Sequence, residues 1–304
     1  MKKTLIRLSS ALMLLTTVFS LCSFTVSAAE PEIISESREV YRNQLSVYGV
    51  KNRQIGSYAR KSVYINGKAR DYSGRIIDGV AYLPVKSFIE DIAGAKVSYS
   101  SSTKTLTASG NGYNISLSDG AYVLYSSDRP MFSMMPALVL SDGNMYAPVS
   151  TLSRALGVSI SYSGSYVSVS GKSSPIAHAS KFYREDEVYW LARIINAESR
   201  GEPLLGQIAV GGVVLNRVKS SLYPNTIWSV IFDRKYGVQF SPILDGSIYA
   251  EPTYTAILAA KICLEGFSLS DDTLFFLYPR ASTSSWIPQN REYAFSIGKH
   301  DFYK

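Results

Sequence analysis

Glu198 and Glu202 stand four residues apart, directly after an apolar stretch and on either side of Gly201. Apolar residues recur at spacings of three and four between Val188 and Ile195, which predicts a helix that ends near Glu198. A carboxyl group at the C-terminal end of an apolar helix meets partial negative charge and low polarity, and both raise its pKa. A carboxyl group that keeps its proton near neutral pH can protonate a glycosidic oxygen. Glu198 is therefore our candidate acid/base residue.

Glu202 is the second carboxylate of this segment. On a continued helix it would share a face with Glu198. However, Gly201 and Pro203 are expected to terminate the helix between the two carboxylates. We predict that Glu202 is a secondary residue of the site, and a helix-capping or structural carboxylate is the alternative.

Further residues downstream could contact a sugar. Gln207 is polar in an otherwise apolar helical face, so it is expected to point into a cleft. Amide hydrogen bonds and ring stacking make Gln239, Phe240 and Trp286 candidate sugar contacts, although a core role for Phe240 fits equally well. The hydroxyl groups of Thr283 and Ser284 could donate hydrogen bonds near the cleft.

Four other polar residues have structural interpretations that we prefer. Asn216 and Arg217 close a predicted helix, and helix termination with a surface ion pair explains them better than a direct sugar contact. His300 is interpreted as a structural histidine, and His178 as an exposed histidine in a linker.

Other hydrolytic chemistries lack their residues in this chain. A zinc amidase needs about three protein ligands, often His, and the chain has 2 His in all. A cysteine peptidase needs an activated thiol beside a His, whereas Cys263 lies late in a predicted helix and has the pattern of a core residue. The G-x-S-x-G elbow of many serine hydrolases is absent. We expect neither a metal nor a cofactor.

The elements that must position the candidate residues are helical. Helical patterns run from Tyr183 to Glu198, from Leu204 to Val218 and from Thr253 to Leu264. Gly211 and Gly212 interrupt the second pattern at a cost of about 1 kcal/mol each in helix propensity. Close contact between helices is the expected compensation.

The preceding region has a different texture and contains a repeat. Short runs rich in Tyr, Val, Ser and Thr predict strands. The segment 78–85 (DGVAYLPV) recurs as 142–149 (DGNMYAPV), 64 positions later, and each copy is followed by a short helical pattern and a further strand pair. Because Asp-Gly favours hairpin turns and Pro favours a helix start, each copy is predicted as hairpin, short helix, hairpin. The fold class is therefore α+β.

This repeat resembles the copper amine oxidase N-terminal domain family, over residues 63–171. Despite that family name, copper binding is not supported, because the region contains no His and no Cys. The resemblance makes association with the cell wall plausible, and a purely structural stalk is the equally open alternative.

The C-terminal motifs occur in the order of a second family. They are Asn196-Ala197-Glu198, Gly206-Gln207, Asn216-Arg217, Tyr223-Pro224-Asn225, Gln239-Phe240-Ser241, Thr283-Ser284-Ser285-Trp286 and Gly298-Lys299-His300. Residues 183–304 resemble the catalytic domain of the germination-type cell wall hydrolases, the spore-cortex-lytic enzymes. One departure is Tyr278, which stands before Pro279 where the family usually has Asn.

This second resemblance implies a lysozyme-like cleft with one essential Glu, which matches Glu198. We expect a lytic transglycosylase that cuts the MurNAc–GlcNAc bond of peptidoglycan strands. In that reaction the 6-hydroxyl of the muramic acid attacks, which leaves a 1,6-anhydro end and needs no second carboxylate. A water-using muramidase and a non-catalytic wall-binding protein are the alternatives.

The start of the chain predicts export. Lys2, Lys3 and Arg7 precede an apolar run that ends near small residues at 26–29, as in a signal peptide. The predicted parts are a signal peptide at 1–29, a spacer at 30–62, the repeat domain at 63–171, a linker at 172–182 and the catalytic domain at 183–304. We expect a cell wall or spore envelope location and no stable membrane span. A net charge of +7 without a basic run interleaved with aromatics argues against nucleic acid.

Overall fold

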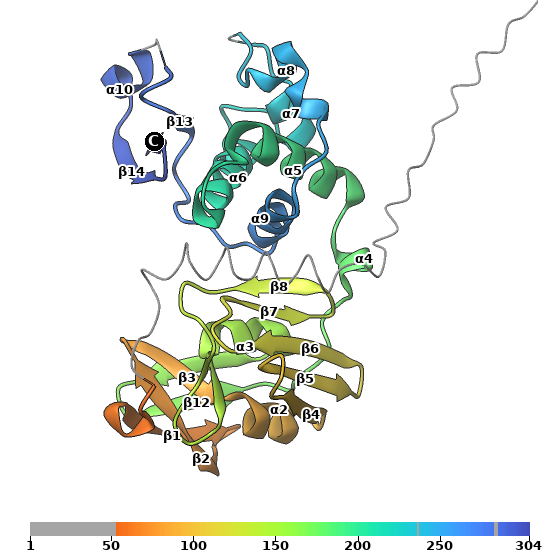
Figure 1. The fold of residues 1–304 in the computed structure, drawn as a ribbon, viewed down its shortest axis with the longest axis vertical. Helices are drawn as coiled ribbons and strands as arrows, with labels where there is room; N and C mark the ends of the chain where they lie inside the picture. Colours follow the sequence, from red (N-terminus) through yellow and green to blue (C-terminus); the bar gives the residue numbers. More distant parts are fainter. Residues whose placement is uncertain (1–52, 236, 283–284) are drawn as a thin grey trace, which may run out of the picture.

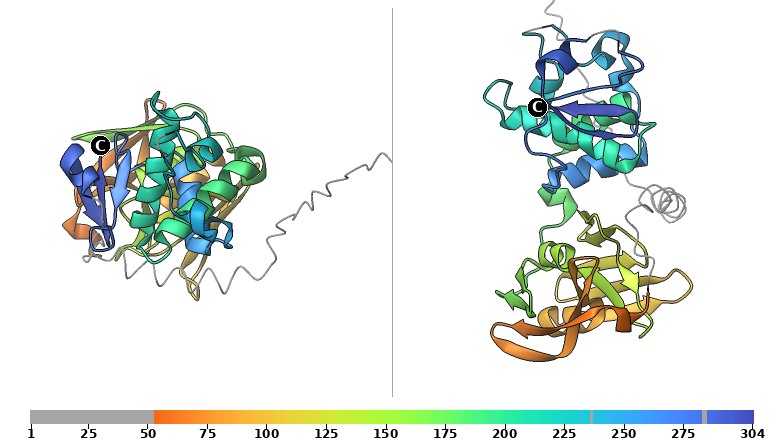
Figure 2. Two further views of the ribbon diagram at one scale, coloured as in Figure 1. Left: turned by 90° about the horizontal axis from the view of Figure 1, so that it is seen from above. Right: turned by 90° about the vertical axis from the view of Figure 1, so that its left-hand side faces the viewer.

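The computed structural model describes residues 53–235, 237–282 and 285–304. The predicted signal peptide, the spacer up to residue 52, Thr283 and Ser284 lie outside these residues. Figure 1 shows a strand-rich part and a helix-rich part joined near α4 (Ala179–Phe182), and the side view in Figure 2 separates them clearly. The α+β class predicted from the sequence is confirmed.

Two antiparallel-rich sheets build the N-terminal part. One has seven strands, in the order β11 (Ser159–Ser163), β12 (Tyr166–Ser170), β1 (Ala59–Ile65), β2 (Lys68–Ile77), β3 (Val80–Pro84), β10 (Met145–Pro148) and β9 (Leu138–Val139). The other has five, in the order β4 (Lys96–Ser100), β5 (Thr105–Gly110), β6 (Tyr113–Ser118), β7 (Val123–Ser126) and β8 (Arg129–Phe132). The 3-10 turn η2 (Ile55–Ser57) precedes them.

The internal repeat folds as predicted. Each copy gives a strand pair, then α2 (Val85–Ala93) or α3 (Val149–Leu156), then a further hairpin. Pro84 and Pro148 are the N-caps of these helices, and each helix ends at a glycine with positive φ. The two repeat cores pair with each other, because β10 lies antiparallel to β3 with Pro148 opposite Tyr82. The Asp-Gly turns of the two copies differ in backbone conformation, since Asp78 has positive φ and Asp142 does not.

Three long helices form the core of the C-terminal part: α5 (Glu185–Ser199), α6 (Leu204–Lys219) and α9 (Tyr254–Leu264). All three were predicted within two residues at each end. Gly211 explains their close packing, since a Cβ there would lie 2.8 Å from Ile195 Cδ1 and 2.9 Å from Cys263 Sγ. The expected helix–helix contact is therefore confirmed at Gly211. A Cβ on Gly212 would lie near only the Ser268 hydroxyl oxygen, at 3.8 Å.

Shorter elements complete this part. They are α7 (Ile227–Ile231), α8 (Pro242–Asp245), η3 (Ser247–Tyr249), α10 (Trp286–Asn290) and a three-stranded sheet of β13 (Phe275–Leu277), β15 (His300–Tyr303) and β14 (Tyr293–Ile297). No pattern in the sequence predicted this small sheet. Among the described residues, no helix is both long and apolar enough to cross a membrane.

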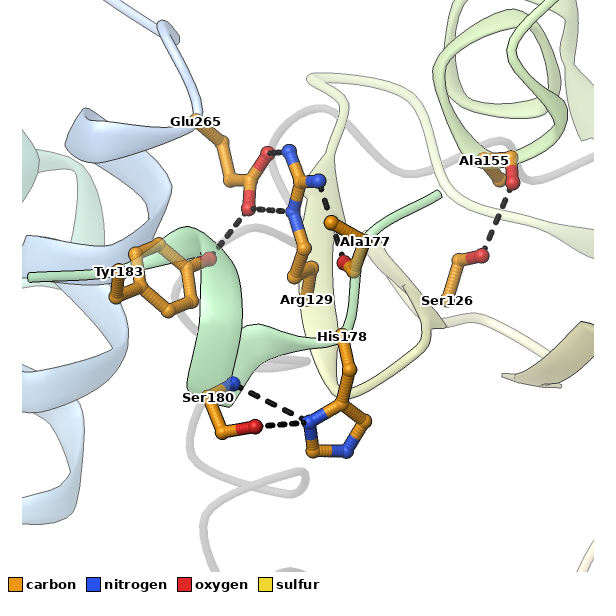
Figure 3. A network of polar contacts seen from close by, with 8 residues as sticks. All are labelled: Ser126, Arg129, Ala155, Ala177, His178, Ser180, Tyr183 and Glu265. Carbon is orange, nitrogen blue, oxygen red and sulfur yellow. Dashed lines mark hydrogen bonds and ion pairs between the residues drawn. The ribbon is translucent and has the colours of Figure 1, made fainter. Parts of the chain in front are cut away.

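The two parts share a buried interface, drawn in Figure 3. Arg129 of β8 binds Glu265, which follows α9, through two hydrogen bonds of 2.8 Å, and the hydroxyl of Tyr183 donates to the same carboxylate. Beside this network Phe132 packs edge-to-face on Phe267, with ring centroids 4.7 Å apart. Phe132 therefore belongs to the same hydrophobic cluster as α5, α6 and α9.

The segment between the parts is held in place as well. The N–H of Ala179 donates to the carbonyl of Ser127 at 2.9 Å. His178 is exposed, as predicted, and it is also held in place: its Nε2 lies 2.7 Å from the Asp128 carboxylate and its Nδ1 accepts from the Ser180 N–H. The residues predicted as a linker thus contact the repeat domain directly.

Candidate active site

Glu198 occupies the last turn of α5, where the sequence predicted a helix end. The helix closes because the N–H of Arg200 donates to the Asn196 carbonyl and that of Glu202 to the Ser199 carbonyl, at 3.1 and 2.8 Å. Glu198 is half-buried, and burial is the largest cause that raises its pKa, to about 7. A carboxyl group with this pKa is poised to give up and take back a proton near neutral pH.

Two charged residues act on Glu198 from other elements. The Asp245 carboxylate of α8 raises the pKa of Glu198 further, and Arg217 of α6 lowers it. Asp245 is exposed, and hydrogen bonds from Ser247 lower its own pKa, so it is an anion at neutral pH. Neither residue was among the site residues predicted from the sequence.

Arg193 of α5 holds the segment that follows Asp245. Its buried guanidinium donates to the carbonyls of Tyr249 and Ala250, both at 2.6 Å. The same helix therefore carries Glu198 and anchors the end of η3, which starts two residues after Asp245. This arrangement explains how α8 is kept beside the end of α5.

The expected surface ion pair of Arg217 is wrong. Arg217 is only 5% exposed, its Nε donates to the Leu274 carbonyl at 2.8 Å, and its Nη1 is buried without a hydrogen-bond partner. Its guanidinium lies over the rings of Tyr223, Phe240 and Phe275, 5.0, 5.1 and 5.7 Å from their centroids. The faces of these rings attract the guanidinium cation and stabilise it in place of a carboxylate partner. Asn216 is structural, since its amide donates to the carbonyls of Ser270 and Thr273.

Glu202 is only 7% exposed and does not sit on the helix of Glu198. One of its carboxylate oxygens accepts the N–H of Lys299 at 2.8 Å, in the turn between β14 and β15. The same oxygen lies 4.0 Å from Nδ1 of His300, which is also buried. Glu202 thus faces the small sheet.

The predicted sugar contacts fall into two groups. Gln207 and Phe240 are 1% and 2% exposed, so they line no open surface. Gln207 donates to the Glu202 carbonyl at 3.0 Å, and Phe240 belongs to the core, as the alternative interpretation had it. Gln239 is partly exposed, and Trp286 is 50% exposed at the start of α10, beside Phe275. Thr283 and Ser284 lie outside the described residues.

The thiol of Cys263 is a core group, as predicted. It is buried, donates to the Ile208 carbonyl at 3.4 Å, and burial raises its pKa to about 12. A thiol with this pKa carries almost no thiolate at neutral pH, so it is a poor nucleophile. Within the described part of the chain, no group of three or more His, Cys, Asp or Glu side chains is arranged to hold a metal ion.

A half-buried carboxyl group with a raised pKa at the end of a helix has the properties of a general acid. Residues 201–303 match the Cell Wall Hydrolase family, and residues 64–170 match the Copper amine oxidase N-terminal domain family. The chain therefore contains a copper amine oxidase N-terminal-like domain followed by a cell wall hydrolase domain. Both resemblances predicted from the motifs are confirmed. The first match begins three residues after Glu198.

Particular relatives are spore-cortex enzymes. The spore cortex-lytic enzyme of Bacillus subtilis (strain 168) is 37% identical over 123 residues, which are 40% of this chain and 38% of that protein. The spore cortex-lytic enzyme of Bacillus cereus is 39% identical over 125 residues, 40% of this chain and 46% of the relative. A solved catalytic domain of the germination-specific lytic transglycosylase SleB from Bacillus anthracis is 39% identical, with 40% of this chain and 97% of that chain covered and a TM-score of 0.37. The chain spans less than half the length of these curated relatives.

Proposed function

We propose that the C-terminal domain cleaves the glycan strands of peptidoglycan, with Glu198 as its acid/base residue. The observation that carries the proposal is the half-buried carboxyl group at the end of α5, whose pKa is about 7. The cell wall hydrolase domain and the spore-cortex-lytic relatives support the same substrate class.

The proposed reaction is a lytic transglycosylation. Protonated Glu198 donates its proton to the oxygen of the MurNAc–GlcNAc bond while the bond to the anomeric carbon breaks. The 6-hydroxyl of the same muramic acid then bonds to that carbon and passes its proton to the Glu198 carboxylate. The products are a 1,6-anhydro end and a free GlcNAc hydroxyl, and Glu198 ends as it began. The positive field of Arg217 favours the anionic state that Glu198 passes through.

Asp245 supports a second candidate reaction, hydrolysis by water. An inverting or retaining glycosidase needs a second carboxylate near the acid. Asp245 is ionised and close enough to raise the pKa of Glu198. In this alternative Asp245, rather than Glu202, is the carboxylate that activates water or stabilises the sugar cation.

We further propose that the protein acts outside the cytoplasm, in the cell wall or spore envelope, after removal of the predicted signal peptide. The repeat domain at 63–171 is proposed to associate with the wall. Because Phe132 and Arg129 of this domain are buried against the catalytic domain, wall association there would hold the catalytic domain at the wall.

The decisive experiment is digestion of purified spore cortex and of vegetative peptidoglycan with residues 30–304, followed by mass spectrometry of the fragments. Anhydromuramic ends from the wild type and none from Glu198→Gln are expected. Reducing ends would reject transglycosylation and make Asp245→Asn the next variant. Absence of cleavage on both substrates would reject an enzymatic role and favour a non-catalytic wall-binding protein.

A further inference from the structure

Glu202 stands where the turn between α5 and α6 meets the small sheet. Its backbone belongs to the turn between α5 and α6, since its N–H donates to the Ser199 carbonyl and its own carbonyl accepts from the Gln207 amide at 3.0 Å. Its side chain leaves this turn and reaches the sheet of β13, β15 and β14. The main-chain position of Glu198, four residues earlier, is therefore tied to the residue that contacts the sheet.

The contact between Glu202 and the sheet is close on every side. The carboxylate accepts the Lys299 N–H at 2.8 Å. A Cβ on Gly298 would lie 1.9 Å from the same oxygen, and one on Gly206 would lie 3.1 Å from Glu202 Cβ and 3.5 Å from Ile297 Cγ2. Both glycines thus let the sheet turn and the start of α6 approach Glu202 without steric overlap.

The sheet held in this way contacts α10, which carries the exposed ring of Trp286. In Figure 1, β13, β14 and α10 form one group beside α6, and the C-terminus ends in the same group. Trp286 of α10 packs against Phe275 of β13, with ring centroids 6.3 Å apart. The position of this group relative to α5 decides where an exposed ring such as Trp286 stands with respect to Glu198.

We propose that Glu202 is a positioning residue that fixes the β13–β15 sheet against the α5–α6 turn and so sets the position of this sheet and of α10 relative to Glu198. The inference rests on the proposed function of the domain. It assigns no proton transfer to Glu202, because the carboxylate is buried and one of its oxygens is taken by the Lys299 N–H.

The atoms around the Glu202 carboxylate indicate which substitution should preserve the contact. The oxygen that accepts the Lys299 N–H is also the one that lies 4.0 Å from the buried Nδ1 of His300. A glutamine at 202 keeps an oxygen to accept the Lys299 N–H and a side chain of the same size, without the negative charge. Alanine at 202 offers neither.

The experiment compares Glu202→Gln, Glu202→Ala and Gly298→Ala in residues 30–304 on solubilised glycan strands. Because misplacement of a reacting group by about 1 Å costs up to roughly hundred-fold in rate, we expect kcat to fall at least about ten-fold in Glu202→Ala and Gly298→Ala. Glu202→Gln should recover most of that loss, with the same product ends and the same alkaline pH limit as the wild type. Gly67→Ala is the matched control, since Gly67 also has positive φ but open space around it.

Three results would overturn the proposal. If Glu202→Gln is as inactive as Glu198→Gln, the carboxylate itself takes part in the chemistry. If folded Glu202→Ala keeps the wild-type rate, the contact positions nothing. Amide hydrogen exchange of Lys299 provides a readout that does not need activity: it should be fast in Glu202→Ala and slow in Glu202→Gln. Equal exchange in both variants would reject the contact, even if the wild type cleaves no glycan and the proposed function fails separately.

Discussion

Glu198 should make the stability of this protein depend on pH, and Glu198→Gln should remove that dependence. Its pKa is about 7 in the folded chain, against an ordinary value of 4.5. Between these two values the folded chain holds a proton that the unfolded chain has lost. Unfolding in this range releases that proton, and the release becomes more favourable as the pH rises, so the free energy of unfolding falls.

The size of the effect follows from the two pKa values. The interval from 4.5 to about 7, at about 1.4 kcal/mol for each pKa unit, corresponds to a loss of about 3 kcal/mol in the wild type. A glutamine has no proton to lose at this position. Relative to the wild type, the variant should therefore gain about 3 kcal/mol between pH 4.5 and pH 8.

Urea unfolding at closely spaced pH values measures this difference directly. The wild type and Glu198→Gln are compared with Glu185→Gln, which removes an exposed carboxylate from the first turn of the same helix. Subtraction cancels the pH dependence of all other groups. A wild-type–variant difference that stays constant from pH 4.5 to pH 8 would show that Glu198 ionises freely in the folded chain. The assignment of Glu198 as an acid near neutral pH would then lose its physical basis.

Three further perturbations test the packing and the electrostatics. Gly211→Ala should lower the free energy of unfolding by about 1–3 kcal/mol through overpacking. Gly212→Ala should raise it by up to about 1 kcal/mol through helix propensity. Equal effects of the two substitutions in urea unfolding would refute the close contact at Gly211. Asp245→Asn should shift the alkaline limit of kcat/KM to lower pH, since Asp245 raises the pKa of Glu198, and an unmoved limit would mean that its field does not reach the acid. Arg129→Met leaves the buried Glu265 carboxylate unpaired and should cost about 3–5 kcal/mol in thermal or urea unfolding; an unchanged midpoint would argue against the interface.

Periodicity in the sequence identified the elements whose folding is local. The ends of α5, α6 and α9 could be predicted because glycine, proline and the three-and-four spacing of apolar residues act within a few positions. The repeat could be predicted because both copies carry the same turn and helix-start residues. The small sheet is different: β13 and β15 are separated in the chain by α10 and β14, and their pairing depends on contacts that no local pattern encodes.

The residues of the candidate site likewise differ in whether local sequence predicts their surroundings. A raised pKa at Glu198 could be predicted from the apolar helix that precedes it, whereas Asp245 and Arg217, which also act on its pKa, come from other elements. Arg217 was misread because a basic residue in the last turn of a helix usually faces solvent, and its aromatic neighbours come from positions 223, 240 and 275. Asp245 gave no signal, since a carboxylate in a short polar segment is ordinary on any surface.

Burial of Glu198 alone would hold its proton too firmly for the first half of the proposed transglycosylation. The same carboxyl group must first release a proton to the leaving oxygen and then accept one from the attacking hydroxyl, so neither state can be strongly favoured. Burial and Asp245 favour the protonated state, while Arg217 favours the carboxylate. Because no carboxylate neutralises Arg217 at ion-pair distance among the described residues, its charge remains available to Glu198. The aromatic rings around Arg217 stabilise its buried guanidinium without cancelling its charge. They therefore help to bring the pKa of Glu198 to about 7, in addition to their role in packing.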